Sequence, residues 1–142
     1  MNTEGDIIII EDDNDDRELL VEFFEETLAK LGHTNKVISF ERPVEALEYV
    51  QNMTQKPFLM ISDLNMPVMT GFQLREKIQD DPRLEQLCVP YIFLTTNGYN
   101  KEIVKEAYKL SVQGYFKKPD NPAEYLQIIE EWIRYWKRAI TT

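Results

Sequence analysis

Five short apolar runs alternate with longer segments of helical periodicity along the chain, and this alternation limits the possible folds more than any other feature of the sequence. We predict that the runs are β-strands, because each is strand-sized and is bounded by turn-forming residues. The predicted strands are 7–10, 37–40, 58–62, 91–95 and 114–117. Strands that alternate with helices pair in parallel, since each parallel connection needs a crossover that a helix can supply. The sequence therefore predicts an α/β fold, a doubly wound five-stranded parallel sheet between five helices.

The segments between the runs carry the apolar stripes of amphipathic helices. These stripes lie within 19–31, 43–50, 71–79, 103–108 and 125–140. Pro43 opens the second predicted helix, a position that suits proline because the N–H it lacks would have no helical partner there. The strands are apolar without alternation, as in the four isoleucines at 7–10, and this is typical of strands buried on both faces.

Charge and cysteine content narrow the classes of function. With 25 acidic residues against 16 basic ones, the chain has a formal charge of -9, which would repel the phosphates of nucleic acids and of anionic membranes. We therefore expect no nucleic-acid and no membrane partner. The single cysteine, Cys88, cannot form an internal disulfide, and no stretch has the features of a signal peptide or a transmembrane helix. The expected location is the cytoplasm.

Charged or hydroxyl-bearing residues lie at the ends of four of the five apolar runs. Glu11 and Asp12 follow the first run, Asp63 follows the third, Thr95 closes the fourth, and Lys118 follows the fifth. Doubly wound folds bind ligands at the carboxyl ends of their strands, so we expect these side chains to converge. Three neighbouring carboxylates repel one another unless a cation intervenes, and hard oxygen ligands suit Mg²⁺. A lysine and a hydroxyl supply the charge and the hydrogen bond that a phosphoryl group needs.

Four motifs occur in order at these strand ends, namely IIIIEDD, SDLNMPVMTG, FLTT and GYFKKP. Together they resemble the response-regulator receiver domain, the phosphoacceptor partner of sensor histidine kinases. The resemblance covers nearly the whole chain and implies the flavodoxin-like strand order 2-1-3-4-5. It also implies a single receiver domain over residues 1–142 with no output domain, and this length suits one domain.

The resemblance assigns the phosphoacceptor and the metal ligands. It implies that Asp63 is the nucleophile and becomes an aspartyl phosphate. It further implies that Glu11, Asp12 and Asp63 hold Mg²⁺, Asp12 directly, with the backbone carbonyl of Asn65 as another ligand.

The same resemblance assigns the switching residues. Lys118 would contact the phosphoryl oxygens, and Thr95 would turn its hydroxyl toward them. Tyr115 would follow as an aromatic switch, and the peptide bond before Pro119 would be cis. The family usually has a small residue after the switch threonine, whereas this chain has Thr96, so the effect of that residue on activation stays open.

The implied partners are a histidine kinase or phosphotransfer protein as donor and a downstream protein of unknown identity, with the chain a monomer or a phosphorylation-dependent dimer.

Two other interpretations of the function remain. An aspartyl-nucleophile phosphatase would have its nucleophile after the first strand and a second aspartate two positions later, where this chain has Asn65. A phosphorylation-independent adaptor would keep the fold alone, and the presence of all the site residues counts against it.

Overall fold

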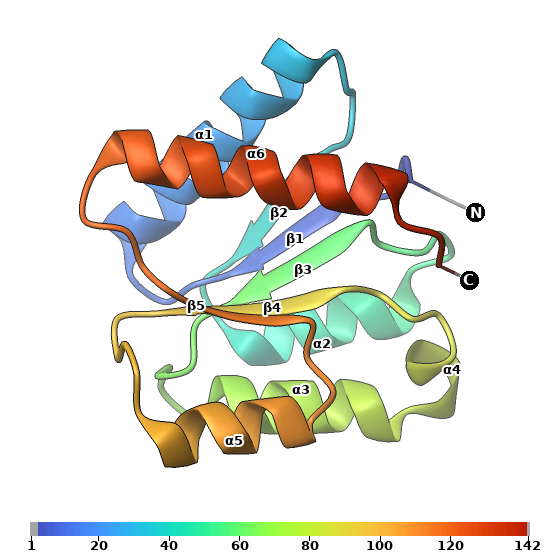
Figure 1. The fold of residues 1–142 in the computed structure, drawn as a ribbon. Coiled ribbons are helices and arrows are strands. Elements are labelled where there is room, and N and C mark those ends of the chain that lie inside the picture. The colour runs from blue at the N-terminus through green and yellow to red at the C-terminus, as the bar shows by residue number, and fades with distance from the viewer. Residues whose placement is uncertain (1–2, 142) are drawn as a thin grey trace.

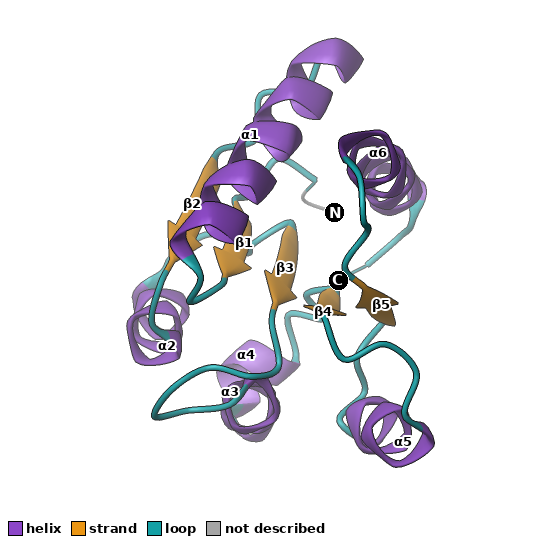
Figure 2. Ribbon diagram, turned by 90° about the vertical axis from the view of Figure 1, so that its left-hand side faces the viewer, coloured by secondary structure: helices purple, strands orange, loops and turns teal. Residues whose placement is uncertain are grey.

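The computed structural model describes residues 3–141, which form one five-stranded parallel sheet with helices on both faces (Figures 1 and 2). The strands are β1 (Ile7–Ile10), β2 (Val37–Phe40), β3 (Leu59–Ser62), β4 (Tyr91–Thr95) and β5 (Gly114–Lys117). The helices are α1 (Asn14–Leu31), α2 (Pro43–Asn52), α3 (Gly71–Asp80), α4 (Pro82–Glu85), α5 (Lys101–Lys109) and α6 (Pro122–Arg138). The strand order is β2-β1-β3-β4-β5 with all pairs parallel. The predicted doubly wound fold and its strand order are confirmed.

Two apolar cores lie on opposite faces of the sheet. Alternate residues of β1 point to opposite sides, so Ile9 joins the core under α1 and α6, whereas Ile10 joins the core over α2, α3 and α5. Figure 2 shows this division, with α1 and α6 on one side of the strands and the other helices on the opposite side. The central strands β1, β3 and β4 are buried throughout, as predicted, and the edge strands β2 and β5 are partly exposed.

Helix α6 packs on α1 through aromatic side chains. Trp132 stacks on Phe24 with ring centroids 6.1 Å apart and meets Phe116 of β5 edge to face at 5.2 Å. Lys30 of α1 and Glu130 of α6 form an ion pair at 2.8 Å on the outer side of this contact. No helix among residues 3–141 is long and apolar enough to cross a membrane.

The structure corrects three details of the predicted fold. It has six helices rather than five, because the four-residue helix α4 is too short to show an apolar period in the sequence. Its signals are local, since the Asp81 side chain caps it and Pro82 is its first residue. Strand β3 begins at Leu59, one residue later than predicted. Helix α6 ends at Arg138, so Ile140 lies outside the apolar stripe and is 88% exposed.

Candidate functional site

The acidic ends of β1 and β3 lie side by side because these strands pair in parallel, with Ile10 opposite Ser62. The Asp63 N–H donates to the Ile10 carbonyl at 3.1 Å, which continues the ladder one residue beyond β3. One carboxylate oxygen from each of Glu11, Asp12 and Asp63 lies within 4.8 Å of the other two. Glu11 and Asp63 are buried and Asp12 is half-buried. The structure thus brings together the three predicted carboxylates, in an arrangement that could hold a metal ion.

Lys118 extends from the end of β5 into this acidic cluster. Its Nζ lies 2.5 Å from Glu11 Oε1, 2.9 Å from Asp16 Oδ2 and 3.7 Å from Asp63 Oδ2. The Lys118 side chain is only 9% exposed, so these contacts are little screened by water. A buried ammonium group that comes from the end of β5 therefore faces the carboxyl groups of Glu11 and Asp63.

Burial perturbs the ionisation of this cluster. It raises the pKa of Glu11 to about 7, against the opposing hydrogen bond from Lys118 and with a further upward contribution from the charge of Asp63. Burial lowers the pKa of Lys118, but its hydrogen bonds to Asp16 and Glu11 outweigh that effect, so the pKa is raised overall. Lys118 therefore stays charged near neutral pH, and its single ammonium group faces several carboxyl groups that are gathered at one point. Such a site favours a further cation.

Thr95, at the end of β4, is the last of the predicted polar residues at the strand ends. Its side chain is fully buried, and its hydroxyl oxygen accepts a hydrogen bond from the Asn97 N–H at 3.3 Å. The Thr95 carbonyl accepts from the Lys118 N–H at 2.8 Å, so the ends of β4 and β5 are adjacent. Thr96, which follows, is exposed. The structure therefore places the hydroxyl and the ammonium group on neighbouring strand ends, as the sequence predicts.

Two loop residues near the site, Asn65 and Asn97, contact each other. The Asn65 side-chain amide donates to Asn97 Oδ1 at 3.2 Å, which links the loop after β3 to the loop after β4. Tyr115 is half-buried, and its hydroxyl donates to the Gly98 carbonyl in the same β4–α5 loop at 3.2 Å. Metal binding by the Asn65 carbonyl and switching by Tyr115 stay predictions.

Gly71 explains part of the SDLNMPVMTG motif, because the start of α3 packs directly on Asp63. A Cβ atom at Gly71 would lie 2.2 Å from the Asp63 carbonyl oxygen and 3.0 Å from the Leu64 Cα. The Gly71 N–H also donates to the Leu64 carbonyl at 2.8 Å. Any larger residue at this position would push the backbone of the candidate nucleophile out of place.

We expect Gly71→Ala to lower the free energy of unfolding by about 2 kcal/mol, because backbone atoms cannot move aside as cheaply as a flexible side chain. Urea denaturation measures this. Gly32→Ala is the control: Gly32 has a φ of 76° with open space around its Cβ position, so only backbone strain, about 1 kcal/mol, is expected there. Wild-type stability in Gly71→Ala would show that the close approach to Asp63 is unimportant.

The structure differs from the sequence-based description of the site at two positions. Asp16 was not predicted to take part, yet its carboxylate receives a hydrogen bond from Lys118. The sequence offers one signal for it, a carboxylate four residues after Asp12. The expected cis peptide before Pro119 is wrong, because no peptide bond among the described residues is cis. Trans is the lower-energy form of such a bond, and Lys118 reaches its acidic partners with the bond in that form.

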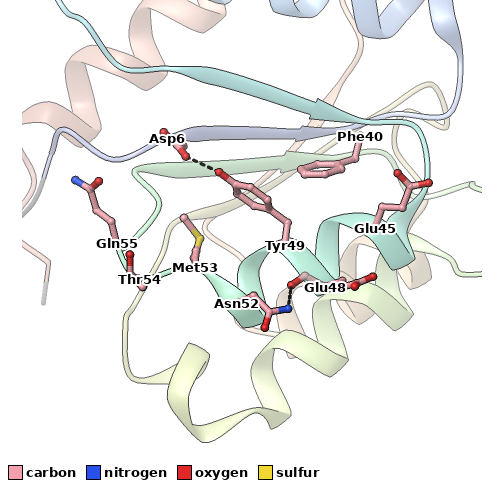
Figure 3. Close-up of a pocket in the computed structure, with 9 residues that line it drawn as sticks. All are labelled: Asp6, Phe40, Glu45, Glu48, Tyr49, Asn52, Met53, Thr54 and Gln55. Atoms are coloured by element: carbon pink, nitrogen blue, oxygen red, sulfur yellow. Dashed lines mark hydrogen bonds between the residues drawn. The ribbon is translucent and has the colours of Figure 1, made fainter.

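A cavity of about 720 Å³ along α2 lies outside this site (Figure 3). Its lining includes Asp6, Phe40, Glu48 and Tyr49 but none of the carboxylates or cations described above. The Tyr49 hydroxyl points to Asp6 and donates to its carboxylate at 2.9 Å (Figure 3). The cavity therefore contributes nothing to the acidic cluster at the strand ends.

Comparison with known sequences identifies the family. A model of the response regulator receiver domain matches residues 7–130. Chemotaxis protein CheY1 of Helicobacter pylori is 34% identical over 118 residues, which cover 82% of this chain and 87% of that protein. The probable transcriptional regulator ycf29 of Porphyra purpurea is 37% identical over 75 residues, and there the match spans 34% of the longer protein.

Solved structures agree with these sequence matches. The phosphorylated cyanobacterial phytochrome response regulator RcpA superposes with a TM-score of 0.82 at 25% identity, over 97% of each chain. The response regulator Rcp1 in its Mn²⁺-bound form has the same fold, with a TM-score of 0.79 at 24% identity over 96% of this chain and 97% of that one. The chain therefore belongs to the response regulator receiver domain family.

Proposed function

We propose that Asp63 accepts a phosphoryl group from a phosphohistidine on a histidine kinase or a phosphotransfer protein. The strongest support is the meeting of Asp63 with Lys118 and two further carboxylates at the carboxyl edge of the sheet. Phosphoryl transfer needs an in-line nucleophile and positive charge near the equatorial oxygens, and little else from the protein. A carboxylate oxygen of Asp63 forms a bond to phosphorus while the bond from phosphorus to the imidazole nitrogen breaks. The imidazole leaves with that electron pair and takes up a proton.

We propose that Lys118 stabilises the product. Its Nζ lies 3.7 Å from Asp63 and 2.5 Å from Glu11, so a small movement of the flexible side chain would bring it onto the new phosphoryl oxygens. Thr95 would add a hydrogen bond from its hydroxyl after releasing the Asn97 N–H. These contacts exist only with the phosphoryl group present, which is the requirement for a switch.

Mg²⁺ is the cofactor we propose for this step, with Glu11, Asp12, Asp63 and the Asn65 carbonyl as its ligands. Three clustered carboxyl groups, two of them buried, support a hard divalent cation, and a relative, Rcp1, has been crystallised in a Mn²⁺-bound form. When bound, Mg²⁺ would supply positive charge to the phosphoryl oxygens. We propose that the chain is a signalling phosphoacceptor rather than an enzyme, and that it assists its own phosphorylation and dephosphorylation in this way.

Mg²⁺ at about ten times its dissociation constant should stabilise the fold by roughly 1.4 kcal/mol, since it binds the folded state and not the unfolded one. For a chain of this size we expect a rise of about 4 °C in the melting temperature. Scanning calorimetry in Mg²⁺ and in EDTA at equal ionic strength measures it. Asp12→Asn should remove most of the rise, and an unchanged wild-type melting temperature would argue against the metal site.

The family supports a signalling role, because receiver domains interact with histidine kinases or phosphotransfer proteins and with downstream targets. We propose that residues 1–142 work as one receiver domain in the cytoplasm, as a monomer or a phosphorylation-dependent dimer. Its output would be a downstream protein that senses the β4–α5 loop, because that loop follows Thr95 and its Gly98 carbonyl accepts a hydrogen bond from Tyr115 of β5.

The proposal is tested by exposing the purified chain to acetyl phosphate in Mg²⁺ and, separately, in EDTA. Intact-protein mass spectrometry should show the addition of one phosphoryl group in Mg²⁺ and little or none in EDTA. An unchanged mass in Mg²⁺, repeated with phosphoramidate as donor, would contradict phosphoacceptor function. Equal labelling in Mg²⁺ and in EDTA would still support phosphoacceptor function but would contradict the proposed requirement for Mg²⁺.

A further inference from the structure

Arg75 of α3 is a buried cation with no acidic partner among the residues that the structure describes. It is 7% exposed, and its guanidinium donates from Nε to the Leu110 carbonyl at 2.9 Å and from Nη2 to the Ser111 carbonyl at 3.0 Å. The group also lies 5.1 Å from the centroid of the Tyr91 ring. Among residues 3–141, no carboxylate lies within ion-pair distance of it. The carbonyls at the carboxyl end of α5 compensate this buried charge only in part, so the position favours an anion.

A cavity of about 350 Å³ lies beside this cation. Its lining includes Pro90, Ser111 and Gln113, which precede β4 and β5, so it is at the amino-terminal edge of the sheet, opposite Asp63. Arg75 lines the cavity, and so does Ser111, whose carbonyl accepts a hydrogen bond from the guanidinium group. The one acidic lining residue, Glu85, is exposed.

The rest of the cavity wall is mainly apolar. Ile78 and Leu84 are buried, and Val89 and Trp136 are half-buried. A second cation stands close by, since Lys56 Nζ donates to the Thr141 hydroxyl at 2.7 Å and Thr141 lines the cavity. The combination of apolar walls with a guanidinium group is typical of sites that bind an organic acid, because the fork of arginine donors matches a carboxylate.

We propose that this cavity binds a small organic monocarboxylate with an apolar body about the size of one ring, its carboxylate on Arg75. The volume is at the lower end of the range for ligand sites, which favours a single ring over a larger molecule. Three of the five guanidinium N–H groups are not used in the bonds to Leu110 and Ser111, so donors remain for the ligand.

Benzoate and benzamide are the probes, because they have nearly the same shape and only benzoate carries a charge. In ¹⁵N-edited NMR titrations at low chloride, benzoate should saturate and shift the Ser111, Gln113 and Trp136 signals. Benzamide should bind at least about tenfold more weakly, as expected for loss of a charged hydrogen bond. Equal affinity of the two probes, no saturation by benzoate, or shifts confined to the neighbourhood of Lys118 would overturn the proposal.

Arg75→Met removes the cation with little change in volume and should abolish the preference for benzoate. Arg83→Met is the matched control, because Arg83 also donates to backbone carbonyls, those of Val50 and Met53, but does not line the cavity. It should keep the preference. Should Arg75→Met fail to fold, Glu85→Gln replaces it: this exposed variant should bind benzoate at least as tightly as wild type, and weaker binding would count against an anion site. None of these results depends on phosphorylation of Asp63.

Discussion

Asp63→Asn is expected to abolish phosphorylation by acetyl phosphate, so that intact-mass spectra in Mg²⁺ show only the unmodified chain. The substitution keeps the shape of the side chain but replaces the nucleophilic carboxylate with an amide, which does not attack phosphorus under these conditions. The Asp63 side chain is 10% exposed and lies beside Lys118 and the β1 carboxylates, and no other described carboxylate has those neighbours at the end of β3. The expected effect is therefore a loss to the detection limit.

Asp15→Asn is the matched control, because Asp15 is exposed on α1 and has no part in the acidic cluster. It should be phosphorylated like wild type. Labelling of Asp63→Asn to the wild-type extent would show that another residue is the acceptor and would refute our assignment.

Lys118→Met should have the largest effect on stability among single substitutions at the site. It removes the ammonium group that Glu11 and Asp63 face and leaves a buried carboxylate without its partner, which we expect to cost about 3 kcal/mol. Guanidinium or urea denaturation in EDTA measures the loss. Lys117→Met, at the exposed neighbouring position, should change stability by less than about 0.5 kcal/mol.

The loss in Lys118→Met should also depend on pH. Burial already raises the pKa of Glu11 to about 7, and removing Lys118 takes away its hydrogen bond and its charge, which oppose this rise, and leaves only the hydrogen bond from the Asp13 N–H. A carboxyl group whose pKa is raised in the folded state stabilises the fold when protonated, and that contribution is lost as pH rises through the folded pKa. The variant should therefore lose more stability at pH 8 than at pH 5, and Mg²⁺ should restore part of it at pH 8. A loss independent of both pH and Mg²⁺ would contradict the electrostatic account.

The fold was predictable wherever the sequence signal is local and repeated. The apolar runs of β1, β3 and β4 mark strands buried on both faces, and the alternation with helices fixes a parallel sheet. Helix α4 escaped prediction because four residues cannot display a helical period. Ile140 was assigned to the wrong environment because a periodic pattern does not show where the last helix ends.

The sequence could predict which residues gather at the site, because a parallel sheet brings the residues that follow its strands to one edge. The sequence could not show how Lys118 divides its contacts among Glu11, Asp16 and Asp63, since that division depends on the three-dimensional placement of the side chains. Arg75 illustrates the same limit. An arginine within an amphipathic helix ordinarily faces solvent, and its burial against the carbonyls at the end of α5 depends on how α3 and α5 pack.

Chemical trapping of the acceptor tests the central claim most directly. The wild-type chain is phosphorylated with acetyl phosphate in Mg²⁺ and then reduced with borohydride, which converts an acyl phosphate to an alcohol and leaves free carboxylates unchanged. Peptide mass spectrometry should then find homoserine at position 63 and nowhere else. Homoserine at position 12 or 16 with an intact Asp63, or no reduced residue at all in a phosphorylated chain, would contradict the account.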